Sequence, residues 1–489
     1  RLVALVLAAP SVSCGADASV GTLLPQSQQA AARGQTAQGL ELVNQALDQD
    51  PGYPPLWRQK ASLQITANDY DGALDTLAVL LKAEPDDIET NVLELTALLR
   101  LGDKGTPRLE QYVSGVKESM AASLIESLLP RSQAKADLTR LLAVWKPASA
   151  DGETVKRLAA GYAKDDDAAV RELADAPAPA SQKNVIAALQ FQAGREALAG
   201  KRLELAQTLL DKALANGYDP VAVTGELGWV RYNQGQPNAA ADLWESQWRE
   251  APDVGLWAGW IADARLTAKD YPRAADFLEK TLQFSPRNPL YQGQYLFALR
   301  ASGQNDKADA FEEKLRADSD QDGLHFGLAM TAWNRGDDAG AAEEFSQIKN
   351  RRPFRDRIIE LADALVGSIG VKGDPAKSIA SIENLIEGLD VRGNILRDIG
   401  WRLWAAKRPD MALSFWQQSL KEGLPAGDPL VARVTPLLIE TGRTGEAMAL
   451  LRAYAPEVTP LGLAWSLAAA NRWDLVGKVL PAVPAGPYP

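Results

Sequence analysis

Histidine and cysteine, on which most nucleophilic and zinc-dependent catalysis relies, are scarce in this 489-residue chain. There is one histidine, His325, and one cysteine, Cys14. Zinc sites of the common kinds need several His or Cys ligands, and a Ser/His/Asp or Cys/His mechanism needs an imidazole beside the nucleophile. We therefore expect no enzyme of these classes and no cofactor. Carboxylate-based chemistry, such as a glycan hydrolase or lyase, stays open as an alternative.

One short acidic segment has the spacing of a cation-binding loop. Asp318, Asp320 and Asp322 alternate with polar residues and are followed by Gly323, which resembles the opening of an EF-hand calcium loop. Such a loop ends with a glutamate at its twelfth position, which is Ala329 here. Because aspartate is also a favoured helix N-cap, we expect a turn that caps the next helix, with calcium binding as the alternative.

The charge balance bears on the kind of partner. Lys and Arg number 52 and Asp and Glu 63, giving a formal net charge of −11, and the basic residues form no block. Nucleic acids and anionic lipids are held mainly by neutralisation of their phosphates. The sequence therefore argues against both as partners.

The first residues have the pattern of an export signal. Residues 2–9 read LVALVLAA after Arg1, a run too short to span a bilayer but suited to the apolar core of a signal peptide. The small residues around Cys14 resemble a bacterial lipobox, in which the cysteine is lipidated, although Ser11 stands where that motif favours Leu. The alternative is cleavage after Ala18. Both readings predict export, and we expect a periplasmic protein anchored to the outer membrane through Cys14.

The helical elements of the chain follow a fixed period. A small residue followed four later by a large apolar one recurs throughout, and we call the small residue the anchor. The later anchors are separated by 34, 34, 34, 33, 35, 36 and 35 residues. They are Ala206, Ala240, Ala274, Ala308, Ala341, Ala376, Ala412 and Ala447, with Gly39 and Ala73 as two earlier ones. Ala308 and Ala376 depart from the pattern, since Glu312 and Ala380 follow them.

Two further marks keep step with the anchors. A proline lies twelve residues after several of them, as at Pro51, Pro85 and Pro286, where it ends a helix. A glycine lies five residues before others, as at Gly235 and Gly303, and suits a tight turn between helices.

These marks resemble the tetratricopeptide repeat, a helix-turn-helix unit of about 34 residues. The fullest match comprises Leu227-Gly228, Gly235, Ala240, Trp244 and Pro252. The resemblance implies an all-α, right-handed solenoid of stacked helix pairs, because each pair alone leaves an apolar face uncovered.

Six segments follow from the pattern. They are a signal at 1–18, a flexible spacer at 19–29, N-terminal repeats at 30–103, irregular helical repeats or a hinge at 104–186, a C-terminal array at 187–480 and a tail at 481–489.

By the same resemblance, the first helices of the repeats line a groove that takes extended peptides or a partner's helix. Counting eleven and eight residues back from the anchors gives one face of those helices, and it is rich in aromatics. The count gives the pairs Trp229/Tyr232, Met330/Trp333 and Trp401/Trp404, and Phe297 and Phe326 lie nearby. Large aromatics on an accessible wall bind peptides, apolar helices or sugar rings. The alternative is that they pack between repeats.

The leading hypothesis is thus a non-enzymatic scaffold of the cell envelope that binds protein partners through its groove. Tetratricopeptide lipoproteins of this kind serve exopolysaccharide export, pilus or secretion-system assembly, and recruitment of cell-wall enzymes, an analogy that the fold alone does not establish. The second hypothesis is direct binding of a polysaccharide by the groove aromatics.

Overall fold

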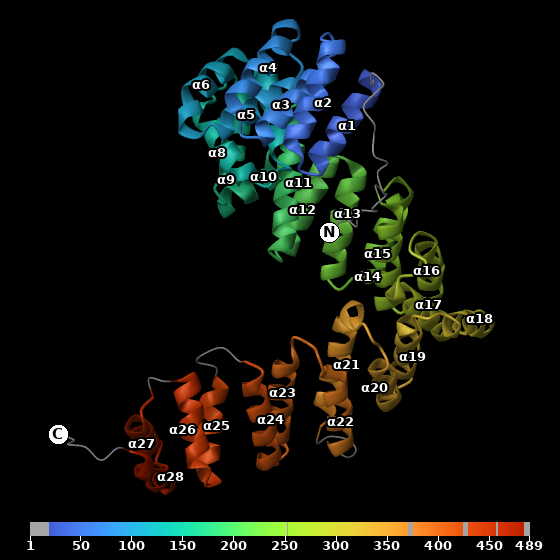
Figure 1. Ribbon diagram of the computed structural model, residues 1–489, viewed down its shortest axis with the longest axis vertical. Helices are drawn as coiled ribbons and strands as arrows, with labels where there is room; N and C mark the ends of the chain where they lie inside the picture. Colours follow the sequence, from blue (N-terminus) through green and yellow to red (C-terminus); the bar gives the residue numbers. More distant parts are fainter. Residues whose placement is uncertain (1–18, 252, 370–374, 424–428, 456–457, 484–489) are drawn as a thin grey trace, which may run out of the picture. The chain divides into compact units, whose positions relative to one another are not determined.

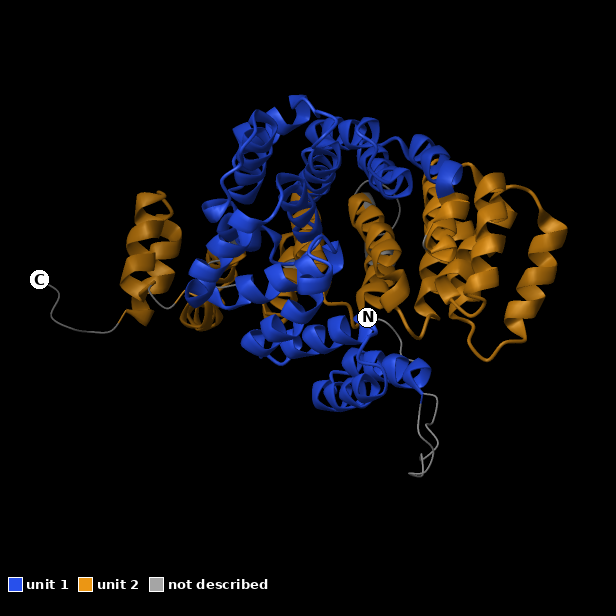
Figure 2. Ribbon diagram, turned by 90° about the horizontal axis from the view of Figure 1, so that it is seen from above, with its two compact units in different colours: residues 1–247 blue, residues 248–489 orange. Residues whose placement is uncertain are grey.

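The computed structural model describes residues 19–251, 253–369, 375–423, 429–455 and 458–483, and these ranges contain helices and no strands (Figure 1). The chain divides into two compact units, residues 1–247 and 248–489 (Figure 2). The division falls within residues 187–480, the predicted C-terminal array. None of the described helices is both long and apolar enough to cross a bilayer.

Unit 1 contains α1 (Val20–Ala32), α2 (Thr36–Gln49), α3 (Pro54–Thr66), α4 (Tyr70–Ala83), α5 (Ile88–Arg100), α6 (Thr106–Gly115), α7 (Glu118–Leu128), α8 (Ala134–Val144), α9 (Ala150–Ala163), α10 (Asp167–Asp175), α11 (Lys183–Ala199), α12 (Leu203–Ala215), α13 (Pro220–Asn233) and α14 (Pro237–Gln247). Unit 2 contains α15 (Val254–Thr267), α16 (Tyr271–Phe284), α17 (Pro289–Ala301), α18 (Asn305–Arg316), α19 (Asp322–Asn334), α20 (Asp338–Ser346), α21 (Arg355–Ser368), α22 (Pro375–Ile386), α23 (Arg392–Ala405), α24 (Pro409–Lys421), α25 (Pro429–Glu440), α26 (Thr444–Tyr454), α27 (Pro460–Ala469) and α28 (Trp473–Val479).

Most of these helices pair in sequence order, as α11 does with α12, α15 with α16 and α23 with α24. The anchors lie on the second helix of each pair, and those at Ala206, Ala240, Ala274, Ala341 and Ala412 are completely buried. A methyl-sized side chain lets the two helices approach, and the apolar residue four positions later fills the space beside them. The predicted all-α repeat solenoid is confirmed as the fold class.

The turn between the two helices has the same geometry in most of the pairs that the structure describes. The residue five before the anchor has a left-handed backbone, with φ of 76° at Gly34, 75° at Gly235, 76° at Gly303 and 78° at Gly336. The same position is occupied by other residue types in several pairs, with positive φ at Asn68, Lys201, Lys269 and Lys407. Glycine adopts this conformation without steric cost, whereas a lysine is strained there. The turn therefore keeps the same geometry in pairs whose sequence has no glycine at this position.

Residues 104–186 continue the stack with shorter helices. α6, α7, α8 and α10 have between 9 and 11 residues, and the apolar side chains of this segment belong to the core that runs on into α11 and α12.

The structure corrects the expectation of a flexible spacer at residues 19–29. Most of this segment belongs to α1, in which Leu23 and Ala30 are buried against α2 and α3. Ser27, also buried, donates a hydrogen bond from Oγ to the carbonyl oxygen of Gly39 at 2.8 Å. Composition suggested a linker, but the apolar residues of this segment cover the first repeat. The predicted signal and Cys14 lie outside the described residues.

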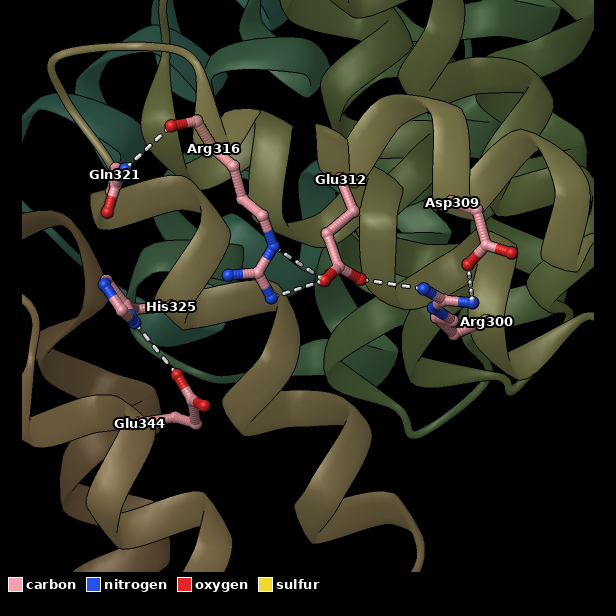
Figure 3. Close-up of polar contacts among 7 residues, drawn as sticks. All are labelled: Arg300, Asp309, Glu312, Arg316, Gln321, His325 and Glu344. Atoms are coloured by element: carbon pink, nitrogen blue, oxygen red, sulfur yellow. Dashed lines mark hydrogen bonds and ion pairs between the residues drawn. The ribbon is translucent and has the colours of Figure 1, made fainter. Parts of the chain in front are cut away.

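One pair in unit 2 breaks the pattern. α18 follows α17 as the second helix of its pair, and it buries only Ala308 and Leu315. In Figure 1 its axis runs across those of α15 and α16. Where other repeats place an apolar side chain, Glu312 instead pairs with Arg300 of α17 at 2.7 Å and with Arg316 at 2.6 Å (Figure 3). Ion pairs replace the apolar contact that would hold α18 against α17.

The next helix, α19, takes the place that α18 leaves and packs directly on α17. Three glycines make this approach possible. A Cβ atom on Gly293 would lie 2.6 Å from the carbonyl oxygen of Gly323, and one on Gly327 would lie 2.9 Å from the carbonyl oxygen of Gly293. Any larger side chain would push the helices apart. The α17–α19 crossing therefore depends on residues without side chains.

Candidate protein-binding groove

A groove of about 390 Å³ opens beside this crossing, in unit 2. We call it the α17–α19 groove. Its lining residues are Leu266, Thr267, Lys269, Tyr271, Gln294, Phe297, Phe326, Met330, Trp333, Asn334, Arg357 and Glu360. The volume lies at the lower end of the range for ligand-binding clefts, about 300 to 1,000 Å³. It therefore suits a short segment or a single large side chain.

Helical periodicity explains why these side chains converge. Phe326, Met330 and Trp333 lie at positions i, i+4 and i+7 of α19, which form one stripe on a helix. Gln294 and Phe297 are three apart on α17 and share a face in the same way. Because the glycines bring α17 and α19 together, the two stripes meet along one wall.

A small polar and aromatic frame fixes one side of the groove. Tyr271, at the start of α16, donates a hydrogen bond from its hydroxyl to Oδ1 of Asn334 at 3.2 Å. The Tyr271 ring meets that of Phe297 edge to face, with centroids 5.4 Å apart. Burial raises the pKa of the Tyr271 hydroxyl, so it stays a neutral donor at physiological pH. Residues 63 positions apart in sequence are thus tied together at the groove.

The charged side chains at the rim of the groove differ in whether they form ion pairs. Arg357 pairs with Glu360 at 2.7 Å and lies 3.9 Å from Asp263. Lys269 is exposed in the left-handed turn between α15 and α16, and among the described residues it has no ion-pair partner. The uncompensated charge of the rim is therefore positive, against a chain whose net charge is −11.

The structure brings together four of the eight predicted groove residues. Phe297 and Phe326 are 6% and 1% exposed and form the floor, while Met330 and Trp333 are half-buried. Phe326 contacts Phe354 with tilted rings whose centroids lie 4.6 Å apart, so it is a packing residue. Met330 and Trp333 each pack on the core with one side and line the groove.

The other four candidates form two matching clusters, one in each unit. Trp229 meets the buried Trp244 edge to face at 4.9 Å, and Trp401 meets the buried Trp416 in the same way at 4.8 Å. Tyr232 and Trp404 complete the clusters at 6.4 and 6.0 Å from the same central rings. All four rings thus pack against a buried tryptophan, as the packing alternative expects, although Trp401 keeps 39% of its surface exposed.

A glycine makes room for the central ring of each cluster. A Cβ atom on Gly228 would lie 2.0 Å from Nε1 of Trp244, and one on Gly400 would lie 2.2 Å from Nε1 of Trp416. Each indole donates to a main-chain carbonyl at the same spacing, Gly225 at 3.0 Å and Arg397 at 3.1 Å. The repeated Gly and Trp pattern thus encodes a repeated packing unit.

The acidic loop is held by protein contacts. Asp322 is 5% exposed, and its carboxylate oxygens accept hydrogen bonds from the backbone N–H groups of Lys349 and Asn350 at 2.8 and 2.9 Å. Asp320 accepts from the backbone N–H of Asp322 at 3.1 Å. Within the described ranges no group of three or more His, Cys, Asp or Glu could hold a metal. Both carboxylate oxygens of Asp322 therefore bond the backbone of the following repeat, which favours the predicted structural turn over the calcium alternative.

His325 also has a structural partner. Its Nδ1 lies 2.9 Å from Oε2 of Glu344, which links α19 to α20 (Figure 3). This contact lies outside the α17–α19 groove.

A larger hollow of about 970 Å³ in unit 1 has a different character. Four of its charged side chains pair with one another: Lys135 with Glu196 at 2.7 Å and Arg195 with Glu226 at 2.9 Å. Arg131, which also lines the hollow, donates to the hydroxyl of Thr96 at 2.7 Å. The Tyr162 hydroxyl also donates to Glu196, at 2.8 Å. Because these polar groups already have partners within the protein, this hollow offers a ligand fewer open hydrogen-bonding groups than the α17–α19 groove does.

Sequence comparison with known families matches one segment of unit 1. Residues 30–99 match the family model described as "Tetratricopeptide repeat". The fold is a tetratricopeptide-like repeat array. No curated protein matches the chain in sequence.

Several solved structures align over most of the chain at low identity. The tetratricopeptide domain of P58(IPK) is 14% identical, with 89% of this chain and 99% of that chain covered and a TM-score of 0.26. The Naa15/Naa10 complex bound to HypK gives 12% identity, 95% and 76% coverage and a TM-score of 0.29. The APC/C hetero-tetramer Cut9–Hcn1 gives 14%, 94% and 96%, and 0.23.

Sequence reasoning missed Gln294, Lys269 and Tyr271 as groove residues. Tyr271 begins a second helix, outside the first-helix face that the anchors define, and Lys269 sits where other repeats have glycine. Gln294 lies three residues before Phe297 on α17, so the face that predicted Phe297 also contains Gln294. A search for polar residues on that face, as well as aromatic ones, would have found it.

Proposed function

We propose that this chain is a non-catalytic scaffold that binds a protein partner in the α17–α19 groove. The observation that carries the proposal is the groove itself, in which apolar side chains of α17 and α19 meet an uncompensated lysine. Interfaces of this make-up, with aromatic and methionine anchors at the centre and charge at the rim, are typical of protein recognition. Tetratricopeptide-like repeats are protein-interaction scaffolds, which supports the same conclusion.

The cellular setting that we propose is the envelope, with the chain exported and attached to the outer membrane through Cys14. Support comes from the sequence pattern of residues 1–18 alone. In that setting, the partner would belong to an exopolysaccharide-export, pilus, secretion or cell-wall machine.

Photo-crosslinking from inside the groove tests the binding role. A photoreactive amino acid replaces Met330, which is half-buried in the groove, and a matched protein carries it at Lys307, which is exposed on α18. In intact producing cells, the Met330 position should give a discrete crosslinked protein that the Lys307 position does not. Identical crosslinking patterns from the two positions would overturn the assignment of the groove.

A further inference from the structure

Gln294 has a feature that apolar packing does not explain. It is 8% exposed, it lines the α17–α19 groove, and its side-chain amide makes no hydrogen bond within the described part of the chain. Gln292, two residues earlier and also 8% exposed, donates from Nε2 to the carbonyl oxygen of Pro286 at 3.0 Å. The amide reaches solvent at the groove, so it is a hydrogen-bonding group open to a partner there.

An amide both donates and accepts, which matches one kind of partner backbone. A peptide in an extended conformation has free main-chain N–H and C=O groups, whereas those in the middle of a helix bond within the helix. A primary amide can therefore bridge an extended backbone but has nothing to bond on the middle of a helix. The groove volume of about 390 Å³ also suits a short strand-like segment better than a helix, which is about 10 to 12 Å across.

The apolar wall next to Gln294 defines a place for one side chain. Phe297 is held by its contact with Tyr271, and Met330 and Trp333 lie half-buried on the facing helix. Methionine is flexible and polarisable, so this wall adapts to aliphatic or aromatic side chains. Among the described residues that line the groove, Lys269 is the charged side chain without an ion pair, and it favours an acidic neighbour.

We propose that the groove binds an extended segment of its partner that carries an apolar residue next to an acidic one. The apolar side chain enters between Phe297, Met330 and Trp333. The Gln294 amide bonds the main chain at that residue, and the acidic side chain lies beside Lys269. This inference rests on the proposed function, because it specifies what the groove of that scaffold recognises.

Fluorescence polarisation with synthetic hexapeptides tests the recognition. The full chain is titrated into labelled peptides of Ser and Ala that carry a central Glu-Leu pair. Changing Glu to Lys should weaken binding about fivefold, which corresponds to the loss of a partly exposed ion pair. Methylating the main-chain nitrogen of the Leu should weaken it about three- to tenfold, as expected for one hydrogen bond.

The Gln294→Leu variant shows whether that hydrogen bond is made to Gln294. It keeps a side chain of similar size, and it should bind the unmethylated peptide about three- to tenfold more weakly while binding the methylated peptide as the wild type does. If the loss of affinity caused by Gln294→Leu and the loss caused by methylation of the peptide simply add, Gln294 does not bond the peptide backbone.

Lysine variants provide the matched control for the charge. Lys269 and Lys407 both have left-handed backbones, with φ of 61° and 58°, and both are exposed. Replacing either by Gly relieves the same strain, so both variants should be at least as stable as the wild type. Only Lys269→Gly should lose preference for the Glu peptide, and equal preference in all three proteins would overturn the acidic part of the inference.

The peptide experiment separates this inference from the proposed function. If the protein crosslinked at Met330 binds but none of the Glu-Leu peptides does, the extended-segment inference falls and the scaffold role stands. If the crosslinking patterns at Met330 and Lys307 are also identical, both fall.

Discussion

Gly293→Ala should disrupt the crossing on which the groove is built. The added Cβ atom would lie 2.5 Å from Cδ1 of Phe326 and 2.6 Å from the carbonyl oxygen of Gly323. The phenyl ring is itself buried, and the carbonyl belongs to the backbone of α19, so neither can turn aside cheaply. The two helices must move apart.

The expected magnitude follows from two opposing effects. Overpacking of a tight contact costs about 1 to 3 kcal/mol, while replacing Gly by Ala inside a helix gains about 1 kcal/mol. The net loss should be about 1 to 2 kcal/mol, because one of the two clashes is with backbone. Displacement of Phe326, which forms part of the groove floor, should also weaken ligand binding.

Amide hydrogen exchange measures the effect where it arises, since repeat arrays open locally. Exchange in α17 and α19 should accelerate in Gly293→Ala. Gly367→Ala on α21 is the control, because a Cβ atom there would meet no atom within 4 Å, and it should leave exchange unchanged or slower. Equal protection of α17 and α19 in the two variants would refute the role given to the close crossing.

Three further predictions concern charge and attachment. Burial raises the pKa of Glu312, but the hydrogen bonds from Arg300 and Arg316 outweigh this and lower the pKa overall. The stabilisation by Glu312 is therefore present above the unfolded pKa and lost as pH falls through the folded pKa. Glu312→Gln should loosen α18 by about 1 to 2 kcal/mol at pH 7, as measured by hydrogen exchange, and the effect should shrink as pH falls through the folded pKa. Burial raises the pKa of Glu94 to about 7, so ionisation of this side chain destabilises the folded state. Glu94→Gln should therefore raise the free energy of unfolding at pH 8 by about 1 to 2 kcal/mol, after allowance for partial exposure, and by much less at pH 4, as measured by chemical denaturation. Metabolic labelling with palmitate should mark the wild type and not Cys14→Ala, and equal labelling would remove the lipid anchor.

The repeat could be predicted from sequence because each of its marks reports a local physical requirement. An anchor such as Ala240 must be small wherever two helices touch, and Gly235 suits a left-handed turn. These constraints recur at a nearly fixed spacing, so they reinforce one another. The anchor at Ala308 shows the limit of this reasoning. The sequence shows that Glu312 stands where other repeats have an apolar residue, but it does not show how this changes the packing of α18. Ion pairs between side chains twelve residues apart do not form a periodic signal.

The groove was only partly predictable for a similar reason. The helical face gave Met330 and Trp333, because they follow the repeat register. The same register also gave Trp229 and Trp401, which pack against central tryptophans, and sequence position alone does not separate the two situations. What makes Gln294 notable is the lack of a hydrogen-bond partner in the described structure, and that is a three-dimensional property.

The most direct test of the central claim is the affinity of the protein crosslinked at Met330, once purified, for variants of this chain. Replacing both Met330 and Trp333 by Ala should weaken binding at least about tenfold, since anchors at an interface centre each contribute more than about 1 kcal/mol. The matched control replaces Met411 and Trp473, which lie outside the groove, and should bind as the wild type does. Equal affinity of the groove variant and the control would contradict the assignment of the α17–α19 groove as the binding site.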